Sequence, residues 1–369
     1  MKGLYLVFGE HPLDDPNGIS KKIINQVEVF NKAGLNCKIV SLLRKTDAFF
    51  LKYFDIALLS KGLPIWKYRK EYSDVDYIYM RRTNYMSKRM RGLFKRIKKK
   101  NPNVKIIMEI PTYPYDQETL GNIYTKPFYP VDVYNRKRLK GLVDRFAVLN
   151  DNLPELWGVP TLKISNGIIF DKITVRKPSA GDDINCIAVA MFMRWHGFER
   201  VFEGLKEYYD SENGKRNIVI HMVGEGAELG RYKEIVKNYD LEEHVKFYGF
   251  LNSNEMDEVY NKCSIAFGAF GFYKIGLSVA ASLKTREYLA KGMPIVSGSD
   301  MDINHMGFKY YYEFPNDESI VNIEKIVSFH DRLYSNGTEE DVIRNIREFG
   351  EKNVSMEACM REVINYINN

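Results

Sequence analysis

The sequence has few cysteines, no long apolar run and no short-period repeat. The first two of these absences exclude particular classes of protein. Its four cysteines lie far apart and form no CxxC pair, which argues against zinc ligands and disulfides and predicts reduced packing residues. No apolar run reaches membrane-spanning length, and the one within the N-terminal MKGLYLVFG is too short for a signal peptide. We therefore expect a cytoplasmic protein that is at most peripheral on the inner face of the membrane.

Acidic residues are absent between Tyr77 and Met108, where lysine and arginine are frequent. The centre of this run has an apolar edge formed by Leu93, Phe94 and Ile97. A basic amphipathic helix can lie on anionic lipid, and a solvated helix face is the ordinary alternative. We expect Arg81–Lys100 to contact an anionic membrane surface. No nucleic-acid motif accompanies the run, so nucleic acid is not an expected partner.

Length and composition indicate a soluble enzyme with two domains. A chain of 369 residues is long for a single core. Its hydrophobic fraction of 45% and charged fraction of 28% are those of a globular protein rather than a disordered one. The formal net charge of +6 suits an anionic substrate, an anionic membrane or nucleic acid, and does not choose between them.

Apolar runs alternate with helical patterns along the chain, which predicts an α/β fold with parallel sheets. The polar linker Asp171–Asp183 divides them into two series, and two series predict two doubly wound domains facing a cleft. We expect domains at 1–170 and 171–345, with a helical segment at 346–369 packing back towards the first. The predicted strands are Leu4–Phe8, Cys37–Leu43, Asp76–Met80, Val104–Ile110, Arg145–Leu149, Asn185–Ala190, Ile218–Val223, Val245–Tyr248, Ser264–Phe267 and Pro294–Ser297. The last predicted helices are about Glu318–Leu333 and Thr338–Asn369.

The stretch Gly276–Gly298 is the strongest candidate for a ligand site. It predicts a helix at Leu283–Lys291 that begins after the N-cap Ser282 and ends at Gly292, followed by a buried strand. An ordinary buried βα unit is the alternative.

The start of this helix combines backbone N–H groups with the Ser282 hydroxyl and the cations Lys284 and Arg286, which favours a phosphate. Glu287 lies five residues past Ser282, about 7.5 Å along the helix axis. A sugar hydroxyl could therefore bond to Glu287 while a diphosphate binds at the helix end.

Three further groups follow predicted strands at their carboxyl ends, where open parallel sheets bind ligands. Asn17-Gly18-Ile19-Ser20 would admit a sugar or phosphate, with a plain turn as an equal alternative. The segment 190–197 offers Arg194, His196 and Gly197 to a diphosphate, although a lone histidine is usually structural. Gly224-Glu225-Gly226 is a weak signal, since such glycines more often form a tight turn than a nucleotide contact.

Four segments, taken together, resemble the carboxyl-terminal half of glycosyltransferase family 4 enzymes, and more narrowly the bacterial members that build surface polysaccharides. In order they are WHGFERVFEGL, HMVGEGAELGRY, VKFYGF and SLKTREYLAKGMPIV. Asn17-Gly18, the EIPTYPYD segment at Glu109–Asp116, and Ser165-Asn166-Gly167-Ile168 extend the resemblance into the first half.

The resemblance implies a GT-B fold, in which two Rossmann-like domains bind a nucleotide-sugar donor and an acceptor. It also implies metal-independent transfer with retention, no cofactor, and a UDP- or GDP-linked donor. By position it assigns the ribose to Glu287, the diphosphate to the backbone at Ser282–Lys284, and the nucleobase to the loop at Phe250. The predicted donor-binding residues are Ser282, Leu283, Glu287, Gly224, Glu225, Phe250 and Gly197; those that stabilise the diphosphate are Lys284, Arg194 and His196; those that face the acceptor or sugar are Gly18, Tyr113 and Asp116.

Three departures from the family pattern affect the mechanism. The usual phosphate-binding arginine and lysine are replaced by Met191 and His196. The first glutamate of the paired-glutamate motif falls near Val279 and is missing. No histidine lies in the usual first-domain catalytic region, where Glu109 becomes a candidate catalytic residue and the leaving phosphate is an alternative acceptor for the proton.

We therefore predict a retaining glycosyltransferase that moves a sugar from a nucleotide diphosphate sugar to a hydroxyl of a lipid-linked glycan, in surface polysaccharide synthesis. The expected partners are the nucleotide sugar, the glycan acceptor and an anionic membrane. A nucleotide-sugar epimerase of the same fold and a binding subunit without turnover are the alternatives.

Overall fold

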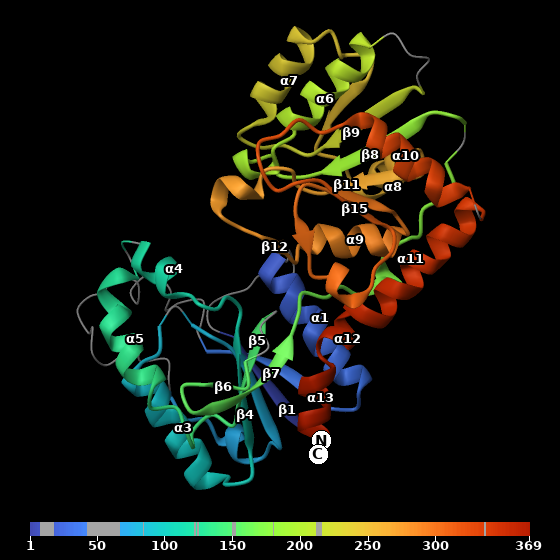
Figure 1. Ribbon diagram of the computed structural model, residues 1–369. Helices are drawn as coiled ribbons and strands as arrows, with labels where there is room; N and C mark the ends of the chain where they lie inside the picture. Colours follow the sequence, from blue (N-terminus) through green and yellow to red (C-terminus); the bar gives the residue numbers. More distant parts are fainter. Residues whose placement is uncertain are drawn as a thin grey trace. The chain divides into compact units, whose positions relative to one another are not determined.

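The chain forms two compact α/β units, shown in the computed structural model of Figure 1. The structure describes residues 1–7, 18–42, 67–83, 85–121, 123, 125–149, 153–179, 181–211, 216–335 and 337–369. Unit 1 comprises Met1–Asn166 and Cys359–Asn369, and unit 2 comprises Gly167–Ala358. Phe8, Leu43 and Asn17, which belong to predicted elements, lie outside the described residues. The predicted limits of the domains stay a prediction.

Unit 1 contains a seven-stranded sheet in the order β2-β1-β3-β4-β5-β7-β6. Neighbouring strands are parallel, except the antiparallel pair β6 and β7. Residues of β1, β3 and β4 are almost all buried, as strands covered on both faces require. The strands are β1 Gly3–Val7, β2 Cys37–Ser41, β3 Tyr77–Arg81, β4 Lys105–Ile110, β5 Arg145–Leu149, β6 Glu155–Leu156 and β7 Val159–Ile164. The α-helices are α1 Gly18–Lys32, α3 Lys88–Lys100, α4 Asp116–Gly121, α5 Tyr129–Arg136 and α13 Arg361–Asn368.

The C-terminal helix α13 belongs to unit 1. Its apolar residues Val363 and Ile367 are buried, and it packs against β7. The Lys105 ammonium donates to the carbonyl oxygen of Ile367 at 2.9 Å, which satisfies an orphan acceptor at the helix end. The Glu362 carboxylate accepts from the backbone N–H of Lys163 at 2.7 Å.

Helix α3 corrects one expectation. Its apolar edge, formed by Leu93, Phe94 and Ile97, is buried in the core of unit 1 and does not face solvent. The alternation of apolar and basic residues therefore reflects a helix that covers a sheet. Any contact of this helix with lipid would use only its charged face.

Unit 2 contains a six-stranded parallel sheet in the order β10-β9-β8-β11-β13-β15, and a separate two-stranded sheet formed by β12 and β14. The strands are β8 Ile184–Val189, β9 Ile218–Val223, β10 Val245–Gly249, β11 Ile265–Phe267, β12 Val279–Ala280, β13 Ile295–Ser297, β14 Asp300–Met301 and β15 Tyr311–Glu313. The helices are α6 Glu199–Asp210, α7 Leu229–Asn238, α8 Ser253–Tyr260, α9 Leu283–Lys291, α10 Ile323–Tyr334 and α11 Glu339–Val354. A short helix, α12 Met356–Cys359, follows α11.

The predicted α/β class with two parallel, doubly wound sheets is confirmed, and the differences are local. The predicted helix Thr338–Asn369 is three helices, because Ser355 is extended and its hydroxyl accepts from the backbone N–H of Ala358 at 3.1 Å. Strands β6, β7, β12, β14 and β15 were not predicted, since they are short or carry little apolar signal.

The four cysteines are buried and form no disulfide, as predicted. In the described part of the chain, no helix is long and apolar enough to cross a membrane.

Replacing Ile97 by alanine should lower the free energy of unfolding by about 2–4 kcal/mol, because it leaves a cavity in the core under α3. Lys99→Ala, on the exposed face of the same helix, should change it by less than about 0.5 kcal/mol. Urea denaturation followed by circular dichroism measures both. Equal effects of the two substitutions would contradict the burial of this edge.

Candidate functional site

The loops that follow β8, β9 and β10 meet at the carboxyl edge of the sheet in unit 2. The backbone N–H of Phe192 donates to the carbonyl oxygen of Glu225 at 2.6 Å, and that of Gly224 donates to the carbonyl oxygen of Gly249 at 2.7 Å. Three loops that are far apart in the sequence therefore form one connected surface.

Close backbone packing explains the glycines of these loops. A Cβ atom on Gly224, whose φ is +123°, would lie 2.0 Å from the carbonyl oxygen of Ala190. On Gly197, whose φ is +64°, it would lie 2.6 Å from the backbone nitrogen of Gly271. The glycines predicted to bind the donor are thus required by the loops themselves, and their contact with a ligand stays a prediction.

Helix α9 begins at the same edge, with the predicted caps confirmed. The Ser282 hydroxyl accepts from the backbone N–H of Thr285 at 3.1 Å, and Gly292 ends the helix with a φ of +76°. Leu283 is exposed at the start of the helix. Arg286 points elsewhere, because its buried guanidinium forms an ion pair with Asp302, with Nη1 2.8 Å from Oδ1. Contrary to the prediction, Arg286 therefore does not offer its positive charge to an anion at the helix start.

Lys284 and Tyr288 of α9 both bond to Val189, the last residue of β8. The Lys284 ammonium donates to the Val189 carbonyl oxygen. The Val189 N–H donates to the Tyr288 hydroxyl at 3.0 Å, and this hydroxyl donates to the Phe267 carbonyl oxygen at 3.2 Å. The helix start is thus fixed at the ends of two strands.

Burial lowers the pKa of Lys284 to about 8, although the neighbouring Glu287 carboxylate opposes the shift. Lys284 is therefore still largely protonated at pH 7 and has a partly desolvated positive charge. Glu287 itself is exposed on the helix.

His196 lies in the short helix Arg194–His196 after β8. Burial, together with the positive charge of Lys284, lowers its pKa to about 4 despite its hydrogen bond with Met193. The backbone N–H of Met193 lies 3.0 Å from Nδ1, and the His196 carbonyl oxygen accepts from the backbone N–H of Phe270 at 2.7 Å. At neutral pH the ring is uncharged, so it can act on an anion as a hydrogen-bond donor rather than as a cation.

Four other predicted site residues lie on the surface of unit 2. Arg194, Glu225 and Glu287 are exposed, and Phe250 is 86% exposed directly after β10. An exposed aromatic side chain at a loop offers a flat apolar surface to a ring.

In unit 1, Glu109 is fully buried in a polar cluster. Its Oε1 lies 3.2 Å from the Lys22 ammonium, and its Oε2 accepts from Tyr79 at 2.7 Å and from Gln26 at 2.9 Å. Burial alone would raise the pKa of Glu109, but Lys22 and Arg81 with these hydrogen bonds lower it below its ordinary value. An ionised carboxylate enclosed in this way suits a structural role, and its catalytic role stays a prediction.

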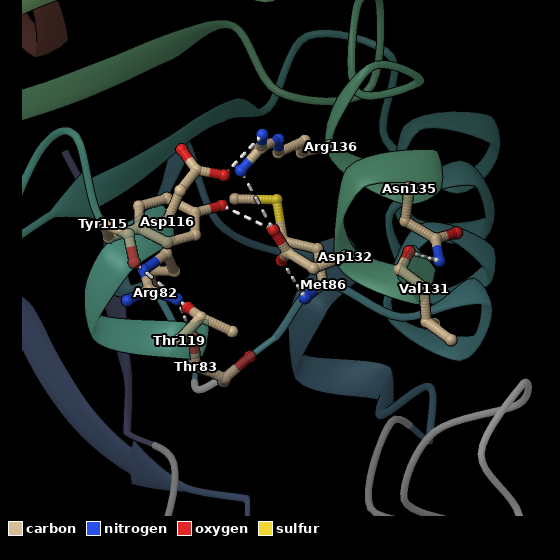
Figure 2. A network of polar contacts seen from close by, with 10 residues as sticks. All are labelled: Arg82, Thr83, Met86, Tyr115, Asp116, Thr119, Val131, Asp132, Asn135 and Arg136. Carbon is tan, nitrogen blue, oxygen red and sulfur yellow. Dashed lines mark hydrogen bonds and ion pairs between the residues drawn. The ribbon is translucent and has the colours of Figure 1, made fainter. Parts of the chain in front are cut away.

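Asp116 lies in a second network of unit 1, drawn in Figure 2. Arg136 donates to Asp116 at 2.9 Å and lies 3.4 Å from Asp132. Asp132, fully buried, accepts from the Tyr115 hydroxyl at 2.8 Å and from the Met86 N–H at 2.7 Å. Burial raises the pKa of Asp132. The network ties α4 and α5 to the segment that follows β3.

Two more contacts support the same region. The Arg82 guanidinium lies 3.7 Å from the centre of the Tyr115 ring, and Tyr113 packs edge-on against Trp157 at 6.3 Å between ring centres. Gly18 is the first residue of α1. The proposed roles of Gly18, Tyr113 and Asp116 towards an acceptor stay predictions.

The sequence did not single out Tyr288, Asp300 or Asp302 as residues of this edge. Asp300 lies three residues after the end of the buried strand β13. Parallel sheets bind their ligands at the carboxyl ends of their strands, where such a residue stands. That signal was available, whereas the contact of Tyr288 with two strands requires the folded chain. No three His, Cys, Asp or Glu side chains gather as metal ligands among the described residues.

Residues 170–306 match the model of a protein family described as glycosyl transferases, group 1. The match covers the loops after β8, β9 and β10 and the whole of α9. No curated protein sequence matches the chain.

Solved structures of similar shape cover this chain over its whole length. A glycosyltransferase from Rickettsia africae has 14% identity and a TM-score of 0.62, over 100% of this chain and 98% of that one. Anabaena HepE in complex with UDP has 12% identity and a TM-score of 0.63, over 100% of both chains. A sucrose-phosphate synthase from Thermosynechococcus elongatus has 13% identity and a TM-score of 0.60, over 100% of this chain and 98% of that one. The predicted GT-B fold, with two Rossmann-like domains, is confirmed.

Gly224→Ala should destabilise unit 2 by about 2 kcal/mol or more, because the added Cβ meets the Ala190 carbonyl oxygen and forces a φ that L-residues avoid. Gly230→Ala in α7 meets no atom within 4 Å and should stabilise the protein by about 0.5–1 kcal/mol. Thermal unfolding monitored by calorimetry distinguishes the two. A neutral Gly224→Ala variant would contradict the packing of the loops.

Proposed function

We propose that the protein is a glycosyltransferase that transfers a sugar from a nucleotide diphosphate sugar to a hydroxyl of a glycan. The observation that carries the proposal is the start of α9, where Lys284 and backbone N–H groups lie at the carboxyl edge of a sheet within the segment matching the glycosyltransferase family. In this proposal the edge binds the diphosphate of the donor.

The largest catalytic demand is the negative charge that builds on the departing diphosphate. Lys284 is already partly desolvated and is fixed by the Val189 carbonyl oxygen, so its ammonium needs little reorganisation to stabilise that charge. Arg194 supplies a second positive charge from the exposed loop after β8. His196 supplies a neutral hydrogen-bond donor, since its pKa lies well below 7.

The nucleoside is bound at two exposed positions on either side of the diphosphate. Glu287 accepts hydrogen bonds from the ribose hydroxyls, and the loop at Phe250 contacts the base. UDP is the first nucleotide to examine, because the structure of Anabaena HepE contains it, and GDP is the alternative. Following the family resemblance, the proposed reaction uses no metal and no cofactor.

Unit 1 is proposed to bind the acceptor through the region of Gly18, Tyr113 and Asp116. Glu109 is enclosed by Lys22, Gln26 and Tyr79, which leaves its carboxylate poorly suited to take a proton from an acceptor hydroxyl. The departing phosphate can take that proton itself, which is compatible with the proposed retention of configuration. The burial of Glu109 also favours a second candidate function, a binding subunit that has no turnover.

We propose a lipid-linked acceptor and a role in surface polysaccharide synthesis, with the protein peripheral on the cytoplasmic face of the membrane. The charged face of α3 supports membrane association: Lys88, Lys95, Lys99 and Lys100 are exposed, while Lys98 is paired with Asp144. Each exposed charge near an anionic surface contributes about 1 kcal/mol.

The protein should float with vesicles that contain anionic lipid and remain unbound with neutral vesicles, because the apolar edge of α3 is unavailable for insertion. Raising the salt concentration should release it. Flotation with both vesicle types measures this association, and equal binding to both would contradict an electrostatic contact.

The affinity for UDP should fall as the pH rises from 7 to 9.5, by up to about tenfold per unit above the pKa of Lys284 near 8. Only the protonated ammonium attracts the diphosphate, so the loss follows deprotonation. Lys284→Met should weaken UDP binding roughly 10- to 100-fold at pH 7 and abolish the pH dependence in this range. Isothermal titration calorimetry measures both effects.

Lys237→Met serves as the control, since it removes the same charge from an exposed position at the far end of α7 and should leave the titration unchanged. If neither UDP nor GDP binds at any pH, the proposed donor site is wrong. If a nucleotide does bind, an activity assay distinguishes the two candidate functions. A glycosyltransferase releases or transfers the sugar of the nucleotide sugar, whereas a binding subunit does neither.

A further inference from the structure

The two-stranded sheet beside α9 carries a partly exposed carboxylate, that of Asp300, on the face where Val279 lies. Strands β12 and β14 pair in parallel, with Val279 opposite Asp300 and Ala280 opposite Met301. Ala280 and Met301 are buried, at 5% and 2% exposure, so the other two side chains share the opposite face. Val279 is 43% exposed there.

This small sheet is fixed to the first turn of α9 by two side chains. Arg286 forms its ion pair with Asp302, and the Thr285 hydroxyl lies 3.4 Å from the Met301 sulfur. The backbone N–H of Asp302 also donates to the Ala280 carbonyl oxygen at 3.0 Å. The strand that carries Asp300 is therefore attached, through the two residues that follow Asp300, to the helix start at which the diphosphate is proposed to bind.

The Asp300 carboxylate is held in one orientation by the helical turn that follows it. Its Oδ1 accepts from the Asn304 amide at 2.9 Å, and its Oδ2 lies 2.7 Å from Nε2 of His305. A carboxylate has about four acceptor positions, so these two bonds leave room for hydroxyl donors. The side chain retains 28% exposure, which keeps it within reach of a ligand.

We propose that Asp300 is the carboxylate that binds the hydroxyls of the transferred sugar. This inference rests on the proposed function, because it needs a donor diphosphate at α9. The family resemblance expects a glutamate near position 279, where this chain has Val279. Neighbouring strands lie about 4.8 Å apart, so an acid on β14 reaches nearly the same volume from the adjacent strand.

The other acids of this region are engaged differently. Asp302 neutralises the buried Arg286, and Glu287 lies on the helix beyond the diphosphate. Glu313, on β15, shares the Asn304 amide with Asp300 at the longer distance of 3.4 Å. Asp300 is thus the acid that combines partial exposure, a fixed orientation and a place opposite Val279 on a strand attached to the first turn of α9.

The test compares the affinity for a free nucleotide with that for its sugar conjugates. Isothermal titration with UDP, UDP-glucose, UDP-galactose and UDP-N-acetylglucosamine, and with GDP and GDP-mannose, identifies the sugar that adds affinity in the wild-type protein. Asp300→Asn should reduce the affinity for that sugar nucleotide by about 10-fold or more, since it removes a charged acceptor. The affinity for the free nucleotide should change by less than about twofold.

Two further variants separate sugar binding from a structural effect. Glu313→Gln, in the same cluster, should leave both affinities unchanged. Adding Val279→Glu to Asp300→Asn returns a carboxylate to the exposed face of β12 and should restore most of the lost affinity. A merely structural role of Asp300 predicts no such rescue.

The experiment distinguishes failure of the Asp300 assignment from failure of the proposed function. If no free nucleotide binds, the donor site itself is wrong. If nucleotides bind but no sugar adds affinity in the wild-type protein, or if Asp300→Asn weakens UDP and its sugar conjugate equally, the assignment of Asp300 is overturned while the donor site remains.

Discussion

The geometry of unit 2 depends on the attachment of helix α9 to the end of strand β8. Both backbone groups of Val189 are used: its carbonyl oxygen accepts from Lys284, and its N–H donates to Tyr288. A strand end at a sheet edge would otherwise leave these groups to water. Because one helix satisfies both, its N-terminus and its lysine are fixed where three loops converge, and the proposed binding of the donor diphosphate depends on this attachment.

The sequence predicted α9 and its caps because the signals are local. Ser282, Gly292 and the apolar strand that follows act within a few residues of the helix ends, and the fold class followed from alternating periodicities of the same range. Side-chain partners were less accessible. Arg286 looked like a free cation at the helix start, and only the folded chain brings Asp302 to it.

The same limit applies to the surroundings of two side-chain groups in unit 1, the apolar edge of α3 and the Glu109 carboxylate. The apolar edge of α3 has the periodicity of both a membrane-surface helix and a helix on a sheet, and the core of unit 1 decides for the second. Glu109 stands in a strand whose neighbours are buried on both faces, so its carboxylate is enclosed and paired with Lys22. Whether a side chain is buried depends on the helices and strands that pack over its segment, and the sequence of that segment alone does not show them.

Amide hydrogen exchange with and without saturating UDP tests the central claim, that the edge around α9 binds the donor nucleotide. We predict slower exchange in the segments 190–197, 224–226 and 282–285, where the loops and the helix start meet, and unchanged exchange in α10, which carries none of the proposed donor-binding residues. Protection confined to other segments, or none at all in the presence of bound UDP, would contradict the account.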